Sequence, residues 1–161
     1  MHRVVQLVAH VRARVEPEEE ALVRRILPER GMALFESMPV ADRRHGLDVA
    51  ERLLRRGHDD ADVLAAALLH DAAKGHRMRL WHRVAGVLLE ALAPSVLRRV
   101  ASPDPSSWRH PFHLHLHHQP LSAALCADAG CPPRVGAFIR GEVADADLPL
   151  LRALTTADDA G

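Results

Sequence analysis

The sequence is poor in the residues that dominate β-sheets and disulfide-stabilised folds. It contains no tyrosine, aromatic residues make up 3% of it, and only two cysteines occur, Cys126 and Cys131. Two cysteines are too few for a disulfide framework, and no second closely spaced pair exists for a zinc knuckle. Few aromatic and β-branched residues beside many Ala, Leu and Arg favour helices over strands. We therefore expect an all-α protein with two ordinary thiols.

No long apolar run and no excess of one charge are present either. No stretch reaches the length that spans a bilayer, and the segment 4–9 lacks the cleavage site of a signal peptide. We therefore expect a cytoplasmic protein with no membrane partner. The 21 basic residues balance the 21 acidic ones and are scattered, which gives no strong nucleic-acid signal. A length of 161 residues fits one domain with a sizeable core.

Helix start and stop signals recur along the whole chain. Residues 3–14 are amphipathic, and Pro17 followed by three glutamates begins a second helix, because acidic side chains suit a helix N-terminus. Gly31 interrupts this region, and Asp42 caps the helix that follows it. The predicted later helices are 42–56, 59 or 60 to 74, 78–92, 95–101, 120–129, 133–142 and 148–159.

The domain organisation follows from these helices. We expect N-terminal helices over residues 1–33 that pack on a bundle over residues 34–161, in a single compact domain overall. The apolar faces of the N-terminal helices could support a homodimer. The oligomeric state is otherwise open.

Histidine is present in excess, with 12 residues, roughly three times an average composition. The helix that begins near residue 60 is apolar almost all round from Val63 to Leu69, so we expect it to be buried. It then meets the pair His70-Asp71. Burying an unpaired carboxylate is costly, and a divalent metal held with the imidazole removes that cost. The alternative is that the pair lies in solvent beyond the buried section.

Two further residues lie on the apolar faces of other helices. Apolar residues follow His45 at spacings of four, which places it on the inner face of helix 42–56; a satisfied core histidine is the alternative. Near the C-terminus, Leu151 and Leu154 share a face with Asp158, whereas Asp159 lies on the solvent side. Asp158 is thus the expected inward carboxylate, with a frayed acidic terminus as its alternative. Such mixed nitrogen and oxygen ligands suit Mn, Fe, Co, Ni or Zn.

The chain carries a histidine, then a His-Asp pair on the next helix, and then a distant aspartate. This order resembles that of the HD superfamily of metal-dependent phosphohydrolases. Residues 69–75 are similar to the HDIGK form of its motif, with Ala72-Ala73 in place of Ile-Gly. The resemblance covers about residues 34–159 and implies an HD-domain helical bundle with a metal site between core helices. It implies four metal ligands: His45, His70, Asp71 and Asp158.

The resemblance also bears on a second metal, which some HD proteins hold with further histidines. The segment beginning at His118 is similar to their His-Pro-x-x-Gly-Ala element, with the proline displaced and serine for glycine. Residues 138–143 are similar to an Ile-Arg-x-His-His element, in which Glu142 and Val143 replace the histidines. A mononuclear site is therefore favoured, and a dinuclear one would add His118 and Glu142. The alternating histidines 113, 115 and 117 are expected at the surface or the pocket rim.

The function implied by the resemblance is hydrolysis of a small phosphate-containing substrate. This is a phosphomonoester or phosphodiester, nucleotides among them, attacked by a metal-bound water that Asp71 orients. Lys74 resembles a lysine that faces substrate phosphate, although the helix dipole also favours a lysine there. Arg44 and Arg83 would add positive charge at the site. The alternatives are a non-catalytic HD domain acting as a nucleotide-binding or regulatory module and, on the same scaffold, a di-iron oxygenase.

Overall fold

The computed structural model describes residues 17–76 and 78–160. Over these residues it contains nine α-helices, one 3-10 helix and no strand, which confirms the predicted all-α class. The helix predicted at 3–14 lies outside the described residues. The elements are α2 (Pro17–Ile26), α3 (Glu29–Ser37), α4 (Val40–Arg55), α5 (Ala61–Leu69), α6 (Leu80–Leu92), α7 (Pro94–Val100), α8 (His110–Asp128), α9 (Pro133–Arg140), η1 (Asp145–Asp147) and α10 (Leu148–Asp159). No helix in the described ranges is long and apolar enough to cross a membrane.

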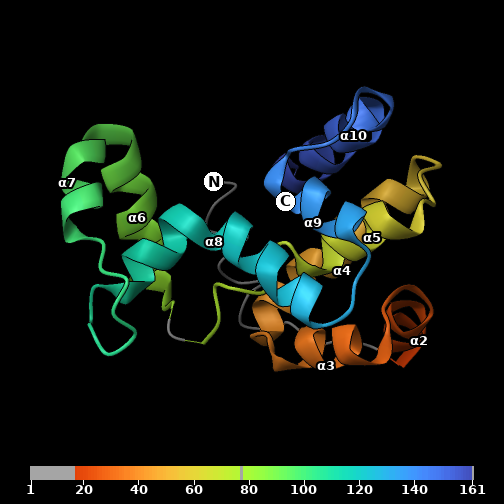
Figure 1. Cartoon of the computed structure of the whole chain (residues 1–161), viewed down its shortest axis with the longest axis horizontal. Coiled ribbons are helices and arrows are strands. Elements are labelled where there is room, and N and C mark those ends of the chain that lie inside the picture. The colour runs from red at the N-terminus through yellow and green to blue at the C-terminus, as the bar shows by residue number, and fades with distance from the viewer. Residues whose placement is uncertain (1–16, 77, 161) are drawn as a thin grey trace.

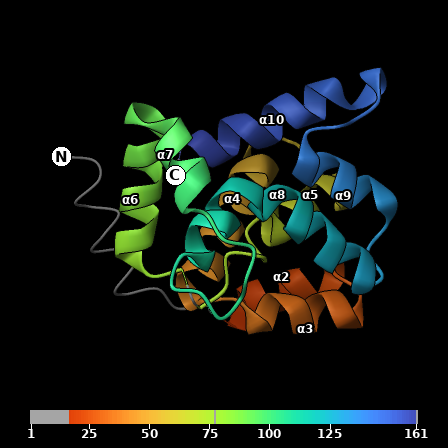
Figure 2. The same cartoon turned by 60° about the vertical axis from the view of Figure 1, so that its left-hand side comes forward.

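The helix α5 is the centre of the hydrophobic core. Every residue from Val63 to Leu69 is buried, and α5 contacts α2, α3, α4, α9 and α10 (Figures 1 and 2). Its start is capped by Asp60, whose carboxylate accepts hydrogen bonds from the backbone N–H groups of Asp62 and Val63. A helix that is apolar on all sides must be surrounded by other elements. The sequence pattern of α5 therefore determines which helices gather around it.

The helix α4 approaches α5 closely at a glycine. A Cβ atom placed on Gly46 would lie 2.9 Å from the carbonyl oxygen of Leu68 and 3.1 Å from that of Ala67. Any larger residue at this position would push the two helices apart. The close approach also brings His45, the residue before Gly46, to the C-terminal end of α5.

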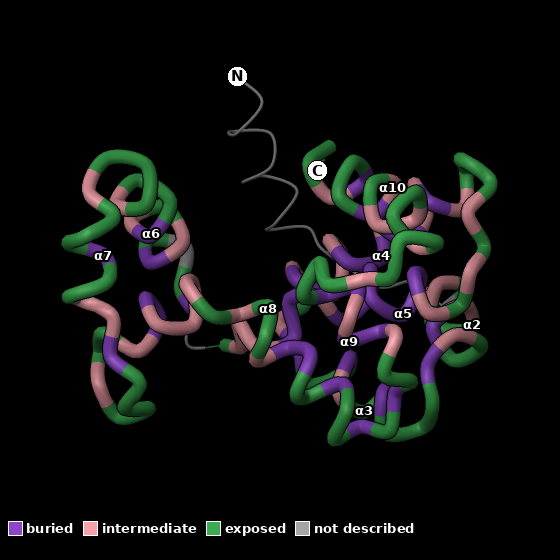
Figure 3. The backbone as a smooth tube through the Cα atoms, turned by 45° about the horizontal axis from the view of Figure 1, so that its top comes forward, coloured by how far each residue is buried: buried purple, intermediate pink, exposed green. Residues whose placement is uncertain are grey.

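The helices α6 and α7 form a pair that projects from the core (Figures 1 and 3). Among the described residues, the buried core cluster includes none from α6 or α7. The long helix α8 contacts both of them. Polar side-chain pairs connect α6 to the rest of the described chain: Arg83 Nη2 lies 2.7 Å from Asp42 Oδ1, and His115 Nε2 lies 3.0 Å from Glu90 Oε2. The rings of Trp81 and His82 also meet the ring of Phe112 on α8, with centroids 6.1 and 5.8 Å away. The described chain thus consists of a core and a projecting helical pair.

Several predicted boundaries were wrong. Asp42 does not cap α4; it is buried in the first turn of that helix, where its carboxylate pairs with an arginine. Gly31 lies inside α3, and so does the expected division between residues 33 and 34. The helix predicted to reach residue 74 ends at Leu69, and turns follow. The helix predicted at 120–129 begins at His110, because alternating histidines obscured its helical period.

Arg134 on α9 connects three elements around the core. Its guanidinium lies 2.8 Å from Asp60 and 3.1 Å from Asp62 at the start of α5, and 2.8 Å from Asp147 in η1. It also lies over the ring of Phe138, 4.9 Å from the centroid. One side chain thus sets where α9 and the beginning of α10 lie relative to α5.

The close approach of α4 and α5 predicts that Gly46→Ala destabilises the protein. We expect a loss of about 1–3 kcal/mol in the free energy of unfolding, because backbone atoms must move to admit the methyl group. Urea denaturation measures it. Gly136→Ala on α9 is the matched control, since its nearest neighbour is the mobile end of Arg140 at 3.2 Å. Equal stability of the two variants would contradict the packing described for α4.

The Arg134 cluster predicts a dependence of stability on pH. Burial alone would raise the pKa of Asp60, but the hydrogen bond and charge of Arg134, together with the backbone N–H donors of Val63 and Asp62, outweigh burial and lower it; the hydrogen bond from Arg134 also lowers the pKa of Asp147. A carboxylate with a depressed folded-state pKa contributes stability above its unfolded pKa of about 4, and this is lost as the pH falls through the folded pKa.

We therefore expect Arg134→Met to unfold at lower urea concentration than the wild type at neutral pH. The difference between the two midpoints should shrink as the pH falls below about 4, where the unfolded carboxylates are protonated. A difference that stays constant over this range would show that the aspartates do not act through Arg134.

Candidate metal centre

Three helices bring ligand-type side chains together at the end of α5. His45 comes from α4, His70 follows the last residue of α5, and Asp158 lies in the last turn of α10. His45 Nε2 lies 2.8 Å from Asp158 Oδ1, and His70 Nε2 lies 3.5 Å from the same oxygen. One atom from each residue lies within 4.8 Å of the other two. Over residues 17–76 and 78–160, no other group of three such side chains is close enough to hold a metal ion.

The ring of His70 is oriented by the backbone. Its Nδ1 lies 2.9 Å from the carbonyl oxygen of Ala67, and because a carbonyl only accepts, Nδ1 carries the proton. The lone pair of the neutral ring is then on Nε2, the nitrogen that faces Asp158. The His45 ring meets the His70 ring edge-on, with centroids 5.2 Å apart. In metal-binding histidines generally, the ring nitrogen that does not bind the metal donates a hydrogen bond, and this bond fixes the tautomer.

Asp71 supplies a buried oxygen that has no partner. The residue is 2% exposed, and its Oδ2 accepts a hydrogen bond from Lys74 Nζ at 2.7 Å. Its Oδ1 lies 3.6 Å from His70 Nε2 and accepts no hydrogen bond. Among the described residues, the other buried polar side-chain atom that has no hydrogen-bond partner is Arg43 Nε. A buried acceptor without a partner is costly, so each case asks for an explanation.

The charge state of Asp71 is determined by its surroundings. Burial alone would raise its pKa, but the imidazole of His70 and the ammonium group of Lys74, which also donates a hydrogen bond, together with His45 outweigh burial and hold the pKa well below its usual range. Burial likewise opposes ionisation of Asp158, where the hydrogen bond to His45 lowers the pKa. Both carboxylates are therefore ionised at neutral pH.

The donor set fits a divalent cation of the first transition row. It combines imidazole nitrogens with carboxylate oxygens, which suit Mn, Fe, Co, Ni and Zn. Donors that each lie about 2.0–2.2 Å from one ion are roughly 3–4 Å from one another. The observed separations of 2.8, 3.5 and 3.6 Å fall near this range. Asp71 is not part of the group of three atoms that lie within 4.8 Å of one another, and its Oδ1 adjoins that group at His70.

A cavity of about 180 Å³ adjoins these donors. Its lining combines the polar donors with apolar residues of α9 and α10. His118 on α8 is also among the lining residues; its Nδ1 lies 2.9 Å from the carbonyl oxygen of His115, which leaves Nε2 as the acceptor. The lining residues are His45, His70, Asp71, Lys74, His118, Gln119, Phe138, Ile139, Gly141, Leu151, Leu154, Thr155 and Asp158.

The predicted residues divide into two groups. The structure brings His45, His70, Asp71, Lys74, His118 and Asp158 to one cavity, and Asp159 is exposed as expected. It does not bring Arg44, Arg83 or Glu142 there. Arg44 pairs with Glu19, Asp48 and Glu51, Arg83 pairs with Asp42, and the exposed Glu142 pairs with Arg140. Each of the three pairs with an opposite charge away from this cavity, so their positions give no support to the roles predicted for them at the site.

Sequence analysis overlooked the role of Ser122. This serine of α8 is fully buried, and its Oγ accepts a hydrogen bond from the backbone N–H of Ala73 at 3.0 Å. The bond holds the turn that carries Lys74 against α8. The available signal was a serine directly before Ala123 and Ala124 in a predicted helix, where a hydroxyl that becomes buried needs a partner.

The site has to be interpreted from its own chemistry. Comparisons of the chain with protein-family profiles, with curated proteins and with solved structures found no match. What remains is the geometry of the donors, the unpartnered oxygen of Asp71 and the composition of the cavity. These are the observations from which function is inferred.

The bond between Ser122 and the turn predicts the effect of Ser122→Ala. Removing the hydroxyl leaves the half-buried N–H of Ala73 without its acceptor, so we expect a loss of about 1–2 kcal/mol in the free energy of unfolding. Urea denaturation measures this loss, and Ser95→Ala, at an exposed position on α7, is the control. The role given to Ser122 is wrong if both serine variants are as stable as the wild type.

Proposed function

We propose that this protein is a metal-dependent phosphohydrolase of the HD type that acts on a small phosphate ester. The observation that carries the proposal is the buried, unpartnered Oδ1 of Asp71 beside the imidazole of His70. Hydrogen bonds within the protein leave this oxygen unsatisfied, and a cation shared with His45, His70 and Asp158 would satisfy it. The order of these four residues along the chain is also the order in which the HD superfamily carries its ligands.

The residues around the donors have distinct roles in this proposal. A divalent cation held by His45, His70, Asp71 and Asp158 would polarise a phosphoryl oxygen and lower the pKa of a coordinated water. The ammonium group of Lys74 lines the cavity and neutralises charge on the phosphate oxygens. Asp71 holds that ammonium in place through its second oxygen, 2.7 Å away. Ile139, Leu151 and Leu154 add apolar surface to the lining and help to exclude water.

The size and charge of the cavity limit the substrate class. Its volume of about 180 Å³ suits one phosphate group with a small substituent. Lys74 is the one lysine or arginine among the described lining residues, so a single phosphate is matched better than a triphosphate. We therefore favour a phosphomonoester or a small phosphodiester. The cytoplasmic location and the homodimer that the sequence suggested are still predictions.

A second candidate is a non-catalytic HD domain that binds a nucleotide or a partner and acts as a regulatory module. The positions of Arg44 and Arg83 favour this candidate, because both arginines form ion pairs with carboxylates away from the cavity. A phosphohydrolase stabilises charge that develops during the reaction, and additional cations would assist it. Product formation distinguishes the two candidates.

The test is hydrolysis of 4-nitrophenyl phosphate and bis(4-nitrophenyl) phosphate with Mn²⁺, Co²⁺, Ni²⁺ or Zn²⁺ added in turn. We expect metal-dependent release of nitrophenol that falls at least about 100-fold in His70→Ala and Asp71→Asn, because each loses a ligand. Asp159→Asn is the matched control, since this neighbouring carboxylate is exposed and should keep wild-type activity.

Two outcomes would contradict the hydrolase. If both site variants hydrolyse these esters as fast as the wild type, the residues are not the site. If the wild type gains thermal stability with a nucleotide but forms no product over long incubation with each metal, the regulatory module is the better account.

A further inference from the structure

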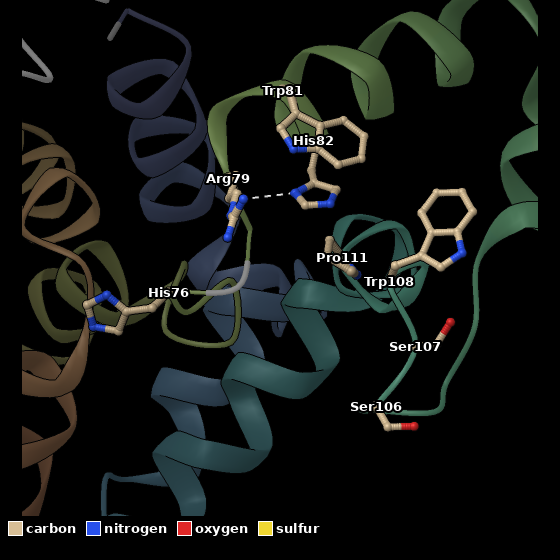
Figure 4. A pocket seen from close by; sticks show the side chains of 8 residues that line it. All are labelled: His76, Arg79, Trp81, His82, Ser106, Ser107, Trp108 and Pro111. Atoms are coloured by element: carbon tan, nitrogen blue, oxygen red, sulfur yellow. Dashed lines mark hydrogen bonds between the residues drawn. The ribbon is translucent and has the colours of Figure 1, made fainter.

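The scarce aromatic side chains of the chain gather at a second cavity. The sequence contains two tryptophans and three phenylalanines, and both tryptophans line a cavity of about 490 Å³ (Figure 4). The other lining residues are His76, Arg79, His82, Ser106, Ser107 and Pro111. The ring of Phe112 is close to both indoles, with its centroid 6.1 Å from that of Trp81 and 6.5 Å from that of Trp108. Three of the five aromatic residues are thus at one place, outside the hydrophobic core cluster.

The two indoles are open to solvent. Trp81 is 50% exposed and Trp108 is 68% exposed. Single exposed apolar residues are common, but two indoles beside one cavity leave large flat apolar surfaces in water. Such surfaces stack with planar rings, and aromatic side chains line most small-molecule pockets. The volume of the cavity also lies within the range that such pockets usually have.

A buried imidazole adds a hydrogen-bond donor to the cavity. His82 is 7% exposed, and its Nδ1 accepts a hydrogen bond from the backbone N–H of Arg79 at 3.1 Å. Since Nδ1 accepts, the proton of the neutral ring is on Nε2. Burial, with the charge of Arg79 second, lowers the pKa of His82, which keeps the ring neutral. In Figure 4 its free nitrogen points toward Pro111 and Trp108.

The remaining side of the cavity is basic and polar. Figure 4 shows Arg79 and His76 on one side of the hollow and Trp108 on the other. The hydroxyl-bearing Ser106 and Ser107 lie below, and none of the described lining residues is acidic. A guanidinium with no carboxylate in the lining suits an anionic group.

We propose that this cavity binds a planar aromatic molecule that carries one anionic group. The ring stacks on the indoles, Arg79 binds the anion, and His82 Nε2 donates to a polar atom of the ring. No described residue lines both this cavity and the metal centre. This binding site is therefore separate from the proposed hydrolase site, and each of the two proposals can be tested without the other.

The position of the two tryptophans makes a direct test available. They are the only tryptophans in the chain, so fluorescence excited selectively at indole reports this cavity alone. We expect adenosine monophosphate, 4-hydroxybenzoate or both to quench it saturably, and the ligand that saturates identifies the ring system as nucleobase or simple aryl acid. Adenosine and ribose 5-phosphate, which lack the anion and the ring respectively, should bind more weakly. No saturable change with either anion up to millimolar concentration would overturn the proposal.

Variants assign the binding to the named residues, with the affinity measured by calorimetry because a tryptophan is removed. Trp108→Ala and Arg79→Ala should each weaken binding at least about five-fold, through the loss of stacking and of the cation. Arg98→Ala, at an exposed arginine on α7, and His70→Ala in the metal centre should bind as the wild type does. Wild-type affinity in both Trp108→Ala and Arg79→Ala would show that the ligand binds elsewhere. Circular dichroism of each variant verifies that it is folded.

Discussion

The burial of α5 is the constraint on which the rest of the structure depends. Its seven residues from Val63 to Leu69 are buried, so other helices must surround it, and Gly46 lets α4 come close enough to do so. The chain then has to leave the core through His70 and Asp71. A carboxylate that is buried by this route needs compensating charge. Lys74 compensates one oxygen of Asp71, and the metal centre that we propose accounts for the other.

The charges of the molecule are distributed so that the two cavities differ in chemistry. Two arginines near the core are held by carboxylates: Arg134 by Asp60, Asp62 and Asp147, and Arg44 by three acidic residues. The cavity at the end of α5 has imidazoles, carboxylates and one ammonium group. The cavity beneath α6 has indoles, an arginine and no acid. The first set suits a cation, and the second suits an aromatic anion.

Those site residues whose positions follow from the 3.6-residue period of a single helix could be predicted from the sequence. Helical spacing alone distinguished Asp158 from Asp159, and the apolar run before His70 predicted a buried helix. The positions of Arg44, Arg83 and Glu142 could not be predicted in this way, because helical period does not show which charged partner a side chain meets. Arg44 pairs with two acidic residues of its own helix and one of α2, Arg83 pairs with Asp42 on α4, and Glu142 pairs with Arg140 on α9. Trp81 and Trp108 are 27 positions apart, and their convergence depends on how α6 and α8 pack. The start of α8 was missed because alternating histidines obscured its 3.6-residue period.

The central claim is that His45, His70, Asp71 and Asp158 hold a metal ion. Elemental analysis of protein purified without a histidine tag or chelator tests it most directly, for the wild type, Asp71→Ala and Asp159→Ala. The account predicts about one transition metal per chain in the wild type and in Asp159→Ala, and its loss in Asp71→Ala. Wild-type protein that holds no metal even after reconstitution with Mn, Fe, Co, Ni and Zn would contradict it.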